Sequence, residues 1–191
     1  MITFKTPLFK RILLVSILIM LDLSGNGQPL VETVRKDDTL IAPGLGAEGI
    51  ILGDYTANLI SVKGYPSRIA QFKTNREVFE DVFRQKGPVK IYFQKIYYYE
   101  KNRFMLFIGE NRVAAIAGMN NYRITSDAIN LGNGLDYFVF SYGNSGAVTL
   151  KKGKNRLIVY PYSGIALADD NGDNKIELYL IFPPAKGKAS P

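Results

Sequence analysis

One pattern of fifteen residues occurs twice in the chain, 79 positions apart, and it constrains the fold more than any other feature. The first copy spans 50–64 and the second spans 129–143. Each copy has isoleucine, leucine and glycine at its first, third and fourth positions, and each ends in glycine. Alternating apolar residues are typical of a strand, and a terminal glycine suits the left-handed residue that ends a helix. The pattern therefore predicts a strand, a turn and a short helix in each copy.

The helix boundaries follow from the residues between these glycines. Asp54 and Asn133 hold equivalent positions and suit a helix N-cap, because a short polar side chain can accept a hydrogen bond from the first turn. Tyr55, Leu59 and Val62 then fall at i, i+4 and i+7, which places them on one face of the first helix.

Each copy continues into a predicted β-hairpin. In the first, strands 104–108 and 113–117 flank a turn that begins at Gly109. In the second, strands 165–168 and 175–182 flank an Asp- and Asn-rich turn whose Asn-Gly pair favours a tight hairpin. The two copies differ in the segment that lies between the predicted helix and the predicted hairpin.

The segment 74–77 of the first copy resembles a capping box that opens a helix through Phe83. The second copy has only 147–154 before its next predicted strand, Leu157–Tyr160.

These residues resemble a known family. The block Leu52-Gly53, ten residues, Gly64-Tyr65-Pro66, then Tyr98-Tyr99 and Phe104 before a hairpin, resembles the SmpA/BamE-type unit, in which a short helical segment packs on a small antiparallel sheet. Two such units in tandem resemble the β-lactamase inhibitor protein, and the resemblance covers most of 40–183. It implies an exported bacterial protein that binds other proteins without catalysis.

The chain also departs from these relatives. It lacks the cysteines of the inhibitor and the lipid-bearing cysteine of BamE lipoproteins, and its second copy has Asn144-Ser145 where the pattern has a proline. Its Lys/Tyr/Asn-rich composition resembles that of exported surface proteins of spirochaetes.

The absence of two residue types narrows the possible chemistry. The 191 residues include no cysteine and no histidine. Disulfides, thiolate metal sites and cysteine nucleophiles are therefore excluded, and the commonest general base and zinc ligand is missing. We expect no catalytic residue, no metal site and no cofactor. A hydrolase based on carboxylates or lysine is the less favoured alternative.

The N-terminal segment predicts export. Residues 1–11 carry three positive charges and no negative one, residues 12–23 are mostly apolar, and small residues follow. The apolar run is too short to span a bilayer, so we expect a signal peptide at 1–27 and no membrane span in the mature chain. The full chain has a net charge of +7, and without the signal peptide it retains a basic excess that favours anionic partners.

Two motifs resemble known ligand sites, but neither has all the residues or the following element that its site requires. The run 168–175 would be a calcium loop, but leucine stands at the first and the twelfth ligand positions, so we interpret it as a hairpin turn. Gly44, Gly46 and Gly49 approach a dinucleotide fingerprint, but a strand-like segment follows them where a helix is required, so we interpret a loop.

The stretch 89–107 is the predicted partner-binding segment. Strict alternation places Val89, Ile91 and Phe93 on one face of a strand. The opposite face would carry the candidate partner-binding residues Lys90, Tyr92, Gln94 and Tyr98, a mixture that interfaces favour. The register beyond Lys95 is open, because a bulge there would exchange the faces. Tyrosines of the second copy extend this surface or pack at the edges of the sheet: Tyr137, Tyr142, Tyr160 and Tyr162.

The sequence therefore predicts an α+β protein with two small antiparallel sheets or one continuous sheet, and a short helix packed on each repeat. We expect a first repeat at 28–122, a second at 123–183 and a flexible tail at 184–191. The predicted function is a non-catalytic protein-binding module of the periplasm or cell surface. A surface adhesin for host matrix or plasma proteins is the alternative, polyanions are possible ligands, and no nucleic-acid recognition motif is present.

Overall fold

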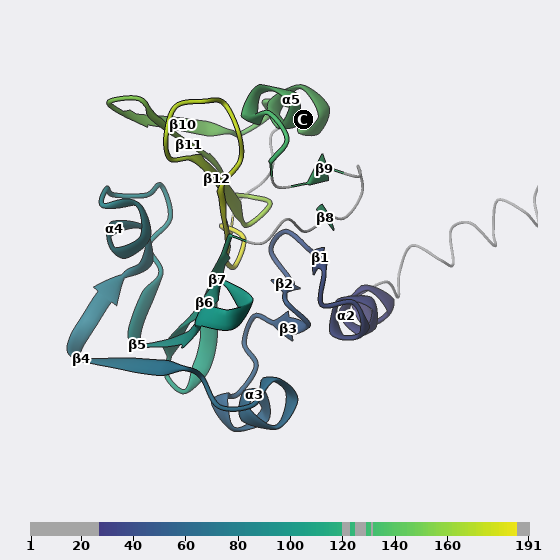
Figure 1. The fold of residues 1–191 in the computed structure, drawn as a ribbon, viewed down its shortest axis with the longest axis vertical. Coiled ribbons are helices and arrows are strands. Elements are labelled where there is room, and N and C mark those ends of the chain that lie inside the picture. The colour runs from purple at the N-terminus through teal and green to yellow at the C-terminus, as the bar shows by residue number, and fades with distance from the viewer. Residues whose placement is uncertain (1–26, 120–122, 125–128, 131, 187–191) are drawn as a thin grey trace, which may run out of the picture.

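The computed structural model describes residues 27–119, 123–124, 129–130 and 132–186, and they form an α+β fold (Figure 1). The predicted fold class is confirmed, with one continuous sheet as its main element. Eight antiparallel strands build that sheet: β4 (Arg68–Glu77), β5 (Tyr92–Tyr99), β6 (Phe104–Gly109), β7 (Arg112–Gly118), β10 (Val148–Lys152), β11 (Asn155–Tyr160), β12 (Ile165–Asp169) and β13 (Leu178–Ile181). Their spatial order is β10-β11-β12-β13-β7-β6-β5-β4.

Short elements surround the sheet. The helices are α2 (Gly27–Lys36), α3 (Thr56–Lys63), α4 (Val78–Phe83), α5 (Leu135–Tyr142) and the 3-10 turn η1 (Glu100–Asn102). Two-residue strands make two small sheets: β1 (Leu40–Ile41), β2 (Gly46–Ala47), β3 (Ile50–Ile51), β8 (Arg123–Ile124) and β9 (Ile129–Asn130). β2 pairs with β3, and β8 pairs with both β1 and β9.

The two halves of the large sheet join where β7 pairs with β13. Gly118 lies opposite Tyr179, and Ile116 lies opposite Ile181. On each side of this junction neighbouring strands are also consecutive along the chain. The junction is therefore the place where strands distant in sequence are paired in the sheet.

The segments that match in sequence make matching hydrogen bonds. The N–H of Gly53 donates to the carbonyl oxygen of Val113, and the N–H of Gly132 donates to that of Ile176, both over 2.8 Å. Both glycines have a positive φ, a conformation that favours glycine. α3 and α5 are also 79 positions apart at both ends, and each ends at a glycine with positive φ.

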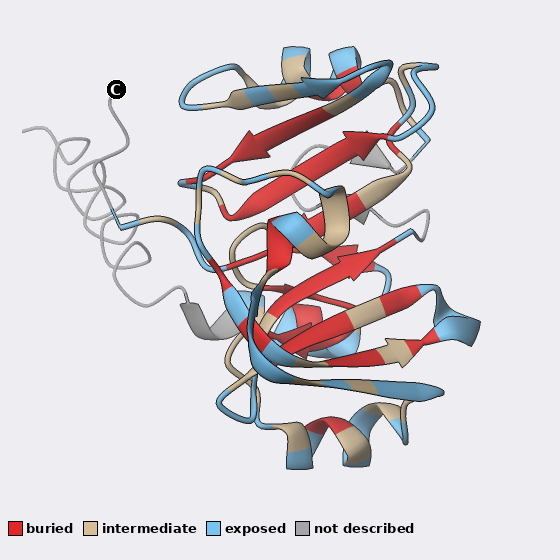
Figure 2. Cartoon of the chain, turned by 90° about the vertical axis from the view of Figure 1, so that its left-hand side faces the viewer, coloured by how far each residue is buried: buried red, intermediate tan, exposed pale blue. Residues whose placement is uncertain are grey.

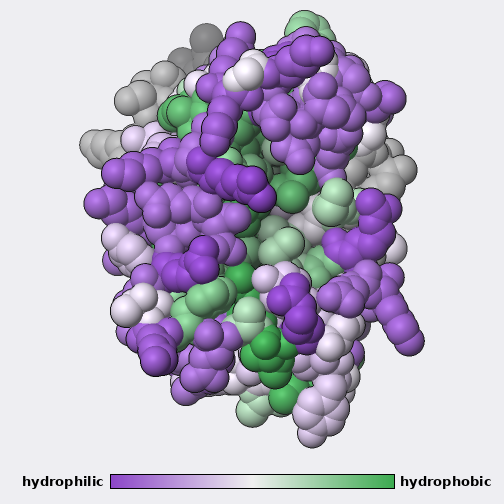
Figure 3. All heavy atoms as spheres, turned by 60° about the vertical axis from the view of Figure 1, so that its left-hand side comes forward, coloured by the Kyte–Doolittle hydropathy of each residue, from purple (hydrophilic) through white to green (hydrophobic). Residues whose placement is uncertain are grey.

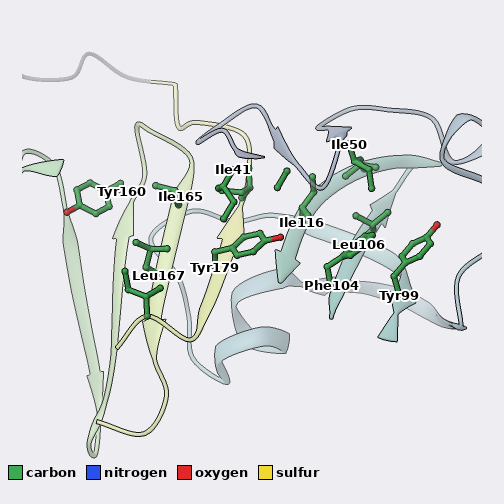
Figure 4. Close-up of a cluster of buried hydrophobic side chains, with 14 of the residues drawn as sticks. Ile41, Ile50, Tyr99, Phe104, Leu106, Ile116, Tyr160, Ile165, Leu167 and Tyr179 are labelled. Atoms are coloured by element: carbon green, nitrogen blue, oxygen red, sulfur yellow. The ribbon is translucent and has the colours of Figure 1, made fainter. Parts of the chain in front are cut away.

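Different elements cover the two faces of the sheet. α3, α5 and β1–β3 cover one face through buried side chains such as Leu59, Phe138, Ile41 and Ile50. Figure 4 shows Ile41 and Ile50 lying over side chains of the sheet. α4 covers the other face with Val78 and Phe79. We call these the α3/α5 face and the α4 face.

The predicted helix starts were wrong. α3 and α5 begin one residue later than Asp54 and Asn133 would allow as caps, and neither start has a side-chain cap. The Asp54 carboxylate instead accepts from the N–H of Ile51, at 2.9 Å, and pairs with Arg35. The predicted apolar face of the first helix also fails, because only Leu59 is buried while Tyr55 and Val62 are exposed.

The fourth helix also starts later than predicted. Residues 74–77 continue β4, and α4 begins at Val78. Glu77 is its N-cap, and its carboxylate accepts hydrogen bonds from the N–H groups of Phe79 and Glu80. Thr74 therefore does not cap the helix, because β4 still pairs with β5 as far as Glu77. The predicted end at Phe83 is confirmed.

The predicted signal peptide, except Gly27, lies outside the described residues, as does the end of the predicted tail. Ala185 in that tail donates its N–H to the carbonyl oxygen of Pro161 over 2.8 Å. Within the part of the chain that the structure describes, no helix is both long enough and apolar enough to cross a membrane.

Candidate protein-binding surface

The α4 face is a broad apolar surface beneath a very short helix. α4 has six residues, whereas the sheet below it has eight strands. Figure 2 shows buried strands on both sides of this helix, and Figure 3 shows apolar side chains in a band between hydrophilic ones. Ten apolar side chains of this face are only partly buried: Ala70, Phe72, Val82, Phe83, Val89, Tyr98, Met105, Ala114, Leu150 and Leu178.

The α3/α5 face is more completely covered. Among the described residues, four partly buried apolar side chains pack against its core: Leu52, Val139, Tyr142 and Ala147. Contiguous, partly exposed apolar surface on one side of a domain is typical of an interaction site. The unequal covering of the two faces therefore makes the α4 face the candidate binding surface.

Two arginines cover aromatic rings on the α4 face. The guanidinium carbon of Arg68 lies 3.6 Å from the centroid of the Tyr98 ring, and that of Arg76 lies 4.4 Å from the centroid of the Phe72 ring. Arg68 also pairs with Glu100, and Arg76 pairs with Asp81. The Arg68–Glu100 pair is exposed and contributes little stability, whereas Asp81 of the second pair is only 19% exposed. The guanidinium groups of Arg68 and Arg76 lie at the surface, and guanidinium groups bind carboxylates well. These two arginines therefore suit an acidic ligand.

A cleft of about 490 Å³ separates the end of α4 from strands β10–β12. Val82 and Phe83 lie on its helix side, and Leu157 and Ala168 lie on its sheet side. Lys152 spans it and donates from Nζ to the carbonyl oxygen of Arg84 over 3.4 Å. Polar and charged side chains make up most of the rest of its lining, among them Arg84, Asn155 and Asp170.

The structure separates the four predicted partner-binding residues. Lys90, Tyr92 and Gln94 are exposed, Tyr92 by 52%. Tyr98 lies instead on the α4 face, half-buried beneath Arg68. The predicted common face is therefore incorrect for Tyr98.

The cause is a break in the alternation of β5. Phe93 and Ile96 are three residues apart, yet both belong to the core of the α4 face. Strict alternation would place them on opposite faces. The paired strand β4 also shifts register here, between Gln71 and Arg76.

The tyrosines of the second half do not extend the surface around Tyr92. Tyr160 is buried on the α3/α5 face, and Tyr142 packs against it with ring centroids 5.0 Å apart. Tyr137 and Tyr162 are exposed. Tyr137 lies on α5, which covers the α3/α5 face, so it belongs to a different region from Tyr98.

The Asp-rich loop between β12 and β13 is held by hydrogen bonds from its own backbone N–H groups to the side chain of Asp169. Asp169 is buried, and its two carboxylate oxygens accept from the N–H groups of Gly172, at 2.6 Å, and Asn174, at 2.9 Å. Over the described residues, no group of three or more acidic, histidine or cysteine side chains could hold a metal ion.

The carboxyl groups with shifted pKa values do not match a general acid. The hydrogen bond from Arg156 lowers the pKa of Asp136, and the backbone N–H of Lys175 lowers that of Asp173. A carboxyl group that donates a proton near neutral pH needs a raised pKa.

The sequence contained little that pointed to the α4 face. Phe72, Met105 and Leu150 occupy alternating strand positions, which predict burial and nothing more. Their partial exposure follows from the shortness of α4, and that shortness follows from the continuation of β4 to Glu77. The six-residue helix that leaves them uncovered starts four residues after its predicted cap.

Comparison with known proteins gives distant similarities. No protein-family model matches the chain, and no curated protein matches it. One similar solved structure is an extracellular protein containing an SCP domain from Bacillus anthracis, with 14% identity and a TM-score of 0.42 over 69% of this chain and 44% of that one. Another is a cysteine-rich secretory protein from Staphylococcus aureus, with 10% identity and a TM-score of 0.46 over 74% of this chain and 46% of that one. This chain therefore spans less than half the length of each.

Proposed function

We propose that this protein is an exported, non-catalytic module that binds another protein through the α4 face of its sheet. The observation that carries the proposal is the incomplete cover of that face, where a six-residue helix leaves seven apolar side chains of the strands partly exposed. Burial of such side chains by a partner is favourable, at about 25 cal/mol per Å² of apolar area. Tyrosine, methionine and arginine are also the residue types that interfaces favour.

The partner that fits this surface has both apolar and acidic groups. Arg68, Arg76, Arg84 and Lys152 surround the apolar side chains of the face. Basic groups at the rim of an interface steer an acidic partner and weaken the binding of a basic one. The basic excess that remains without residues 1–27 acts in the same direction.

In this proposal the chain is an internal duplication of an SmpA/BamE-like unit, with copies at 28–122 and 123–183. The matching hydrogen bonds of Gly53 and Gly132, and the equal spacing of α3 and α5, support it. The helix α4 has no counterpart between β10 and β11. The two copies would then differ in that α4 partly covers the binding face from the first copy alone.

The apolar run at 12–23 supports export to the periplasm or the cell surface. Capture experiments with the mature chain test the binding function. Met105→Gln changes a partly exposed side chain of the α4 face, and Phe140→Ser changes an 87% exposed side chain on α5, which covers the opposite face, as a matched control. We expect Met105→Gln to weaken capture of a partner about tenfold or more, and Phe140→Ser to leave it unchanged.

Hydrogen exchange of the captured complex supplies the second measurement. The partner should protect amides of β5 and β6 beneath the α4 face. Equal capture by Met105→Gln and the unchanged chain would contradict the proposal, as would protection confined to α3 and α5. An adhesin would instead bind immobilised polyanions or matrix proteins in a salt-sensitive manner, with loss of binding above a few hundred millimolar salt.

A further inference from the structure

The two edge strands of the large sheet, β4 and β10, are not equally open to a further strand. β4 shifts register between Gln71 and Arg76, and such an irregularity interrupts the edge. β10 pairs regularly with β11 over its whole length, from Val148 to Lys152. No described strand pairs with the other side of β10. Figure 1 places these two strands at opposite ends of the sheet.

The pairing of β10 determines which of its backbone groups face outward. A two-residue turn, Gly153-Lys154, joins β10 to β11, so the flanking pair Lys152 and Asn155 must be hydrogen-bonded. Hydrogen-bonded and non-hydrogen-bonded pairs alternate along an antiparallel ladder. Thr149 and Lys151 therefore direct their N–H and C=O groups away from β11, toward the open edge.

The side chains of β10 define what could pair with it. Leu150 is half-buried on the α4 face, Val148 belongs to the same face by its register, and Lys152 reaches across the adjacent cleft. Lys151 and Lys154 are exposed beside them. We propose that β10 takes up an extended acidic segment of a partner protein as a ninth strand, with alternate apolar side chains of that segment against Val148 and Leu150.

This inference goes beyond the proposed function, because it concerns the open backbone edge rather than the apolar face. A peptide that adds a strand to an exposed edge gains affinity from main-chain hydrogen bonds and specificity from alternate side chains. The lysines favour an acidic strand and oppose a basic one. A second copy of this chain is less suited, because both copies are basic and each would bring two lysines to the shared edge.

The probe is a heptapeptide of alternating valine and glutamate, compared with a heptapeptide of alternating valine and lysine. Binding to the mature chain is measured by fluorescence anisotropy, and the amide resonances of β10 are followed by NMR. We expect the acidic peptide to bind and to shift the amides of Thr149 and Lys151, and the basic peptide to bind at least about tenfold more weakly.

Thr149→Pro separates edge pairing from simple charge attraction. Proline removes one outward N–H, and an edge strand tolerates it because no hydrogen bond to β11 is lost. We expect this variant to bind the acidic peptide about tenfold more weakly, while Thr149→Val, which keeps the N–H, binds as the unchanged chain does. The unfolding midpoints of both variants check that the sheet remains intact.

Three results would overturn the inference. The first is undiminished binding by Thr149→Pro, which would indicate attraction to the lysines alone. The second is no binding of the acidic peptide at about 1 mM. The third is self-association of the chain that Thr149→Pro abolishes, which would place a second copy on β10. None of these results depends on Met105, so the function proposed for the α4 face is tested separately.

Discussion

Tyr160 on β11 donates its hydroxyl hydrogen to the carbonyl oxygen of Gly143, the residue that ends α5, over 2.8 Å. Tyr99 on β5 makes the same bond to Gly64, which ends α3, over 3.2 Å. The last carbonyl groups of a helix lack partners within the helix. Each tyrosine therefore fixes the end of one helix to the sheet, and the same device occurs in both halves of the chain.

Replacement of Tyr160 by phenylalanine removes the bond and keeps the packed ring. We expect Tyr160→Phe to lower the free energy of unfolding by about 1 kcal/mol, measured by urea denaturation. Tyr162→Phe is the matched control, because that side chain is 46% exposed. An equal effect of both variants would show that the bond to Gly143 adds no stability.

Alkaline pH should weaken the same contact. Burial, together with the nearby Tyr142, raises the pKa of Tyr160 to about 12 from an ordinary value of 10.0. Between these two values the folded state binds more protons than the unfolded state, so stability falls as pH rises through this window. Below pH 10 the contribution is fully present. Urea denaturation at several pH values should give a smaller decline for Tyr160→Phe, and an identical decline would contradict the assignment.

Local sequence signals predicted where the hairpins form, but the tight turn expected at Asn171-Gly172 was wrong, because a loop over 170–177, held by the carboxylate of Asp169, joins β12 to β13. The alternation around Gly109 and the Asn171-Gly172 pair both mark turns between paired strands, and β6–β7 and β12–β13 form there. Gly64 and Gly143 also end their helices as expected. These features depend on residues that are close in sequence, so short patterns encode them.

Features that depend on distant residues were not predictable in this way. Asp54 does not cap α3 because its carboxylate accepts from the N–H of Ile51 and pairs with Arg35. No spacing rule connects positions 35 and 54. The single continuous sheet depends on Gly118 lying opposite Tyr179, which are far apart in the chain. The candidate surface was missed for the same reason, because the partial exposure of Met105 depends on how much of the sheet α4 covers.

A buried polar contact lies near the junction of the two halves. The hydroxyl of Tyr179 donates to Oε1 of Glu48 over 2.6 Å, and both side chains are buried. Tyr179→Phe removes a donor from a carboxyl group that water cannot reach. We expect it to lower the free energy of unfolding by about 1–3 kcal/mol, more than Tyr160→Phe.

Glu48→Gln is the matched variant, because its amide oxygen still accepts from Tyr179. It should retain more stability than Tyr179→Phe in the same urea measurement. A neutral effect of Tyr179→Phe would contradict a stabilising role for this contact.

Gly118 provides the space that Tyr179 occupies at the junction. A Cβ atom built at Gly118 would lie 2.6 Å from Cζ of the Tyr179 ring and would also meet its hydroxyl oxygen. The ring cannot simply move aside, because Glu48 holds that hydroxyl. We therefore expect Gly118→Ala to lower the free energy of unfolding by about 1–3 kcal/mol through overpacking.

A double-mutant cycle tests whether this cost comes from the tyrosine ring. Tyr179→Leu removes the ring atoms that the new methyl group would meet, so Gly118→Ala should cost less than about 0.5 kcal/mol in that background. Urea denaturation of the four proteins gives the coupling energy. The same cost in both backgrounds would mean that Gly118 is required by the backbone conformation of β7. The fit of the Tyr179 ring against Gly118 would then not determine how the two halves join.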